Sequence, residues 1–101
     1  MRVLELYGGI ATSYASKLLA DEGAQVVKVE PPEGDPVRAL GPFKEGAEGS
    51  REGGVFLALN MNKSGVTLDS VDEKNLSGML DWAEIVIHGY DLNRAREIGL
   101  D

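Results

Sequence analysis

Apolar residues occur in short clusters separated by polar, glycine-containing turns. Residues 2–6 form one apolar run, and residues 25–30 form another in which valines are nearly continuous. Such runs are typical of strands covered on both faces of a parallel sheet. Shorter runs at 66–68 and 84–88 indicate a third and a fourth strand.

The segments between these strands have helical spacing. Apolar residues recur at helical intervals from Ala11 to Leu19, and Gly23 stands where a C-terminal cap belongs. Thr12 or Ser13 is the predicted N-cap of this helix.

Two more helices are expected near the end of the chain. Ser70 and Glu73 form a capping box ahead of an apolar stripe that runs to Ala83. A last short helix is predicted over residues 92–98, ending at Gly99.

Alternating strands and helices predict an α/β fold, a parallel sheet with flanking helices and right-handed crossovers. We expect residues 1–101 to form one unit, the N-terminal part of a larger domain, because no strand follows the last helix. Residues 31–54 hold all four prolines and predict a long loop. The apolar run at 55–59 is too short for its period to assign.

Composition narrows the function classes. The net charge is −7 and the ten basic residues are scattered, which disfavours nucleic-acid binding. There is no cysteine, and the sequence has neither a secretory h-region nor an apolar stretch of transmembrane length. We therefore expect a soluble, cytoplasmic protein that does not associate with membranes.

The first strand, glycine turn, helix and second strand have the layout of a nucleotide site. Amides of the turn at Gly8 and Gly9 could face a phosphate at the helix start, and Glu30 stands near the place of a ribose-binding acid. The G-x-G-x-x-G pattern is not met, which argues against a stand-alone dinucleotide-binding domain. In the simpler interpretation, Glu30 is a surface residue.

Catalytic candidates are few. His88 is the only histidine and is interpreted as structural, and no metal site is expected without a second histidine or a cysteine. No carboxylate or nucleophile stands at a spacing that would complete a catalytic triad with it. Lys28 and Lys63 are most simply solvated charges, although Lys63 follows a turn and could reach a phosphate.

Several motifs resemble one known family. Residues 26–38 read VVKVEPPEGDPVR, which closely resembles the segment after the second strand in class III CoA-transferases of the CaiB/BaiF type. That family includes formyl-CoA transferase, carnitine CoA-transferase and 2-methylacyl-CoA racemase. Three further segments resemble the family in the same order, namely VLEL at 3–6, FLALNMNKS with VTLD at 56–69, and AEIVI at 83–87.

The resemblance implies a large Rossmann-like domain, a second smaller domain and an interlocked homodimer. It implies transfer of CoA between carboxylic acids, with CoA thioesters as substrates and no covalently bound cofactor. The family's catalytic aspartate lies beyond the matched segment, so no catalytic residue is assigned here and the chain is expected to be inactive alone. Residues expected near CoA are Gly9, Ile10, Arg38, Lys63, Leu68 and Tyr90.

Departures from the family pattern leave alternatives open. Ile10 stands where the transferases have a polar residue, and Gly89 replaces an asparagine. Val71 and Glu97 stand where cations are usual, which should weaken a polyphosphate site. The alternatives are a degenerate, non-catalytic module and the racemase branch. We also expect Arg38 to pair with Asp35, and the isolated chain to be marginally stable or to self-associate.

Overall fold

The computed structural model describes residues 1–42, 53–68, 73–97 and 99–100. Four strands form one parallel sheet in the order β3-β2-β1-β4, so β1 lies in the interior of the sheet. The strands are β1 (Arg2–Leu6), β2 (Gln25–Glu30), β3 (Ser64–Thr67) and β4 (Ile85–His88).

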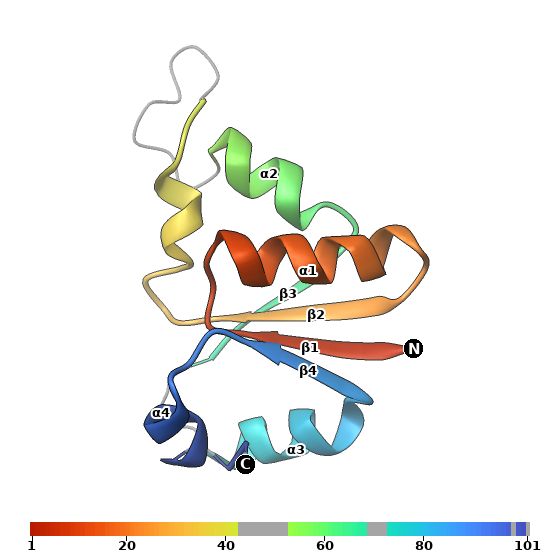
Figure 1. Ribbon diagram of the computed structural model, residues 1–101, viewed down its shortest axis with the longest axis vertical. Coiled ribbons are helices and arrows are strands. Elements are labelled where there is room, and N and C mark those ends of the chain that lie inside the picture. Colours follow the sequence, from red (N-terminus) through yellow and green to blue (C-terminus); the bar gives the residue numbers. More distant parts are fainter. Residues whose placement is uncertain (43–52, 69–72, 98, 101) are drawn as a thin grey trace.

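Helices cover both faces of this sheet (Figure 1). On one face α1 packs on the strands and also contacts α2, while α3 lies on the other face and touches β1. The short helix α4 lies beside the carboxyl ends of the strands (Figure 1). The helical segments are α1 (Ile10–Asp21), the 3-10 turn η1 (Pro36–Ala39), α2 (Gly54–Asn60), α3 (Glu73–Trp82) and α4 (Leu92–Glu97).

The predicted α/β class with a parallel sheet and flanking helices is confirmed. The expected cap at the C-terminal end of α1 is also confirmed, because Gly23 has φ +100° and donates its amide to the carbonyl of Ala20 at 3.0 Å. The capping box lies outside the described residues, as do Ser70 and Val71.

One local prediction was wrong. The N-cap of α1 is Gly9, with no side-chain cap, because Thr12 and Ser13 already lie within the helix and are buried. The described part of the predicted loop at 31–54 contains one short helical turn. Asp35 accepts the amide of Val37 at 2.9 Å and starts the turn η1, and α2 begins at residue 54.

The core centres on β1. Val3, Leu4 and Leu6 are at most 2% exposed, and Val3 packs with Ala20 of α1 and Val26 of β2. Burial of such side chains is the main favourable contribution to folding. In the middle of this apolar strand stands a carboxylate, Glu5, which is 1% exposed.

Pairing of β1 with β4 joins distant parts of the chain. Val3 is in register with Ile85. Next to this pair, Glu84 donates its amide to the carbonyl of Arg2 at 2.9 Å, and Arg2 Nε donates to the carbonyl of Trp82 at 2.7 Å. The interior strand therefore acquires one of its two neighbours only from the last part of the sequence.

Candidate nucleotide pocket and the buried charges behind it

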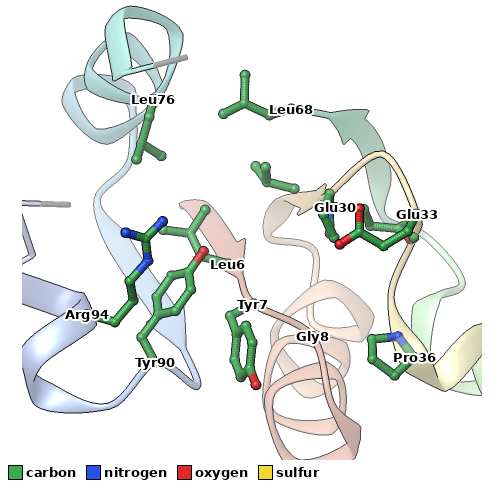
Figure 2. A pocket seen from close by; sticks show the side chains of 13 residues that line it. Leu6, Tyr7, Gly8, Glu30, Glu33, Pro36, Leu68, Leu76, Tyr90 and Arg94 are labelled. Carbon is green, nitrogen blue, oxygen red and sulfur yellow. The ribbon is translucent and has the colours of Figure 1, made fainter. Parts of the chain in front are cut away.

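A pocket of about 330 Å³ opens at the carboxyl ends of the strands. The order of the strands in the sheet reverses at this point. From β1, the chain adds β2 and β3 on one side of the sheet and then β4 on the other side of β1. Open α/β sheets bind ligands at such a switch point. The lining residues are Leu6, Tyr7, Gly8, Val29, Glu30, Pro31, Glu33, Gly34, Pro36, Leu68, Leu76, Tyr90 and Arg94 (Figure 2).

Two tyrosines form one wall of the pocket. The rings of Tyr7 and Tyr90 have centroids 4.9 Å apart and are tilted by 32°. Tyr7 has φ 55°, a left-handed conformation that is uncommon for a residue other than glycine, and its ring packs against Gly89. The amide of Tyr90 donates to His88 Nδ1 at 3.2 Å, which gives that histidine a structural role in the turn after β4. Burial raises the pKa of the Tyr90 phenol.

Among the described residues that line the pocket, Arg94 carries the positive charge. It lies in α4, whose first turn follows the end of β4, and it points into the pocket beside Tyr90 (Figure 2). Its backbone amide donates to Asp91 Oδ1 at 2.8 Å, and its guanidinium donates to Glu97 at 3.0 Å. Since Glu97 is 65% exposed, this ion pair is weak and can yield to a ligand.

The Glu30 carboxylate is occupied by hydrogen bonds from within the protein. Its two carboxylate oxygens accept from Arg38 Nε and Nη2, each at 2.7 Å, and it also accepts the amide of Asp35 at 2.8 Å. Hydrogen bonds from Arg38 hold the pKa of Glu30 below its usual value. The surface interpretation of Glu30 was wrong, because the residue is 7% exposed. Arg38 in turn stacks on Phe56, 3.8 Å from the ring centroid.

A cluster of buried charges lies between β1, β2 and α1, centred on Glu5. Its carboxylate accepts from Lys28 Nζ at 2.7 Å and from Lys63 Nζ at 2.8 Å. The hydroxyls of Ser13 and Ser16 in α1 donate to the same group at 3.2 and 2.5 Å. A carboxylate in an apolar strand is tolerated because these donors replace water.

Lys28 connects this cluster to the loop after β2. Its ammonium lies 2.6 Å from Asp35 Oδ2 and 3.1 Å from Ser13 Oγ. The interpretation of Lys28 as a solvated charge was wrong, since it is 3% exposed. Two ammonium groups and two carboxylates, those of Glu5 and Asp35, therefore balance in charge.

Lys63 completes the cluster from the turn before β3. The side chain is 2% exposed, so the solvated interpretation was wrong here as well. Its ammonium donates to Glu5, to the carbonyl of Ser13 at 3.0 Å and to Asn60 Oδ1 at 2.7 Å. Burial lowers the pKa of this ammonium, and the Glu5 carboxylate opposes that effect.

The pocket brings together some of the residues expected near a ligand. Leu68 and Tyr90 line it. Gly9, Ile10, Arg38 and Lys63 are not among the lining residues: Ile10 is 56% exposed on α1, and the two cations are held by carboxylates. Contact of those four with a ligand remains a prediction.

Arg94 was missed from the sequence. The only available signal was its place in a helix that directly follows a strand, because such a helix begins at the edge where ligands bind. Within the part of the chain that the structure describes, no three potential metal ligands gather, and no helix is long and apolar enough to cross a membrane.

Comparison with known proteins decides the family. The family model for CoA-transferase family III matches residues 1–101. The chain belongs to CoA-transferase family III. This family III chain is 36% identical to a succinyl-CoA:mesaconate CoA-transferase of Haloarcula hispanica over 93 residues, which are 89% of this chain and 24% of that protein. It is 33% identical to a cinnamoyl-CoA:phenyllactate CoA-transferase of Clostridium sporogenes, covering all of this chain and 25% of that one.

Solved structures agree with this assignment. A CaiB/BaiF family protein from Brucella suis superposes with a TM-score of 0.85 at 33% identity, covering all of this chain and 28% of that one. The family III chain thus spans about a quarter of the length of the curated relatives it matches.

Proposed function

We propose that the pocket at the strand ends binds the nucleotide end of a CoA thioester. In a protein of the length of its relatives, it would serve transfer of CoA between carboxylic acids. The observation that carries this proposal is the position of the pocket at the topological switch point, with Leu68 and Tyr90 as apolar walls and Arg94 as its cation.

Each wall suits one part of such a ligand. The Tyr90 ring and the Leu68 side chain offer apolar surface to a flat base. Arg94 offers a charge-assisted donor to a phosphate, for which the exposed Glu97 is a weak competitor. Arg94 thereby supplies a cation in a region where Glu97 departs from the family pattern.

A dinucleotide is the less suitable ligand. Recognition of an NAD ribose requires an acidic side chain that is free to accept its hydroxyls. Glu30 occupies that place in the layout, but Arg38 and the Asp35 amide already use its carboxylate oxygens. Exchange of these partners for a ribose would break two charge-assisted hydrogen bonds from a partly buried guanidinium, which is costly.

Calorimetric titration with CoA and, separately, with NAD tests the proposal. We expect CoA to bind and NAD to bind more weakly or not at all. Arg94→Gln should weaken CoA binding at least about tenfold, since a hydrogen bond to a charged group contributes about 1.5–3 kcal/mol. Arg96→Gln is the matched control on the same helix, because Arg96 is exposed and does not line the pocket.

The outcomes separate the alternatives. Equal losses in the two arginine variants would mean that only overall charge matters and that the pocket is not the site. Binding of NAD alone would overturn the CoA assignment. The carboxylic acid substrates, the transferase or racemase branch and the interlocked homodimer are proposals that rest on family membership. The choice of branch requires activity assays on a protein of the relatives' length.

A further inference from the structure

The wall of the pocket rests on a buried ion pair. Gly34 and Pro36 both line the pocket, whereas Asp35 between them does not. Its side chain is 1% exposed, and its Oδ2 lies 2.6 Å from Lys28 Nζ. In the described part of the chain, this Oδ2 is buried without a hydrogen bond of good geometry, so it depends on the charge of the ammonium.

The same carboxylate also touches a neighbouring part of the pocket wall. A β-carbon added to Gly8, which also lines the pocket, would lie 2.0 Å from Asp35 Oδ2. Gly8 follows the end of β1, whereas Asp35 follows the end of β2. One side chain therefore packs between the segments that follow two neighbouring strand ends.

We propose that the Lys28–Asp35 ion pair is a positioning device for the nucleotide pocket. This inference rests on the proposed function. Lys28 is fixed in β2 and held by Glu5 of β1 at 2.7 Å and by Ser13 of α1 at 3.1 Å. It draws the Asp35 carboxylate against Gly8 and so sets the place of the wall formed by Gly34 and Pro36. Neither side chain of the pair contacts the ligand.

Stability alone is a poor explanation for this pair. Neutral residues of similar shape often replace buried ion pairs with no loss of stability, whereas removal of one partner is strongly destabilising. Loss of both Lys28 and Asp35 charges leaves Glu5 balanced by Lys63. A neutral pair lacks the attraction between ammonium and carboxylate. In the unaltered protein, this attraction holds the segment that contains Gly34 in place. Such supporting contacts keep a binding site in its productive geometry.

Two variants separate positioning from stability. Asp35→Asn leaves Lys28 unbalanced and should lower the melting temperature, while Lys28→Met/Asp35→Asn should recover most of that loss. In the double variant the affinity for CoA should nevertheless stay about tenfold weaker than in the unaltered protein, since small displacements at a site have effects of that order. Lys17→Met/Asp21→Asn is the matched control, because it removes a more exposed ion pair from α1.

A second measurement does not depend on CoA. Residual dipolar couplings report the orientation of the Gly8 and Gly9 N–H bonds in the ligand-free protein. We expect these orientations to change in Lys28→Met/Asp35→Asn and to stay unchanged in the control. Recovery of both stability and affinity in the double variant, or unaltered orientations, would overturn the positioning role. If the unaltered protein fails to bind CoA, the proposed function fails and the couplings still decide this inference.

Discussion

Glu5 offers the most direct test of the buried charge cluster. Its carboxylate lies 2.7 Å from Lys28 Nζ and 2.8 Å from Lys63 Nζ, and Asp35 contacts Lys28. Glu5→Gln would therefore leave Lys63 buried without its carboxylate. Breaking a buried pair costs about 3–5 kcal/mol, and about 1 kcal/mol shifts the melting temperature of a domain this size by about 4–8 °C. We expect the melting temperature to fall by about 12 °C or more.

Urea unfolding followed by circular dichroism measures this loss. Glu5→Gln/Lys63→Met removes the uncompensated charge as well and should recover more than half of the lost free energy of unfolding. Glu84→Gln is the control, because this carboxylate is 51% exposed and lies 3.8 Å from Arg2. It should change stability by less than about 0.5 kcal/mol. A similarly small effect of Glu5→Gln would refute the account of the cluster.

Two further predictions concern the segment after β2. Arg38 holds the pKa of Glu30 below its usual 4.5, so the stability from this pair is present above pH 4.5 and is lost as pH falls through the lowered pKa. Arg38→Gln should lower the free energy of unfolding by about 2 kcal/mol at neutral pH. In a plot of melting temperature against pH, the fall on the acid side should become shallower in this variant, and an unchanged fall would contradict the prediction. A β-carbon on Gly53 would lie 1.8 Å from the Leu40 carbonyl oxygen, so Gly53→Ala should destabilise the protein by about 1–3 kcal/mol in thermal melting. Gly65→Ala is the control, because a β-carbon there meets no atom within 4 Å. Equal effects of the two substitutions would contradict this prediction.

The strands could be predicted because each strand's own residues show that it is buried. The run from Val26 to Val29 is apolar at nearly every position, as expected for a strand with helices on both faces of its sheet. The helix α2 gave no comparable signal. It has seven residues, of which only Phe56 is buried, so neither length nor period distinguished it from a strand or a loop.

The buried charges could not be predicted, because their partners are distant in sequence. Glu5 contacts Lys28 and Lys63, which lie in other elements, and the sequence around each of the three does not identify its partners. Each charge taken alone is more economically placed in water. Ser13 shows the same limit, since a residue expected to cap a helix instead donates to Glu5 at 3.2 Å.

The pairing of β1 with β4 has a consequence for how the chain folds. Val3 and Ile85 are in register across nearly the whole sequence, so closing this part of the sheet carries a large loop-closure entropy. Topologies dominated by distant pairings fold slowly. During synthesis from the N-terminus, β1 can pair with β2 early, but its other edge stays open until β4 has emerged. An unpaired strand edge can pair with another chain, so this interval is when the nascent protein is most exposed to misassembly.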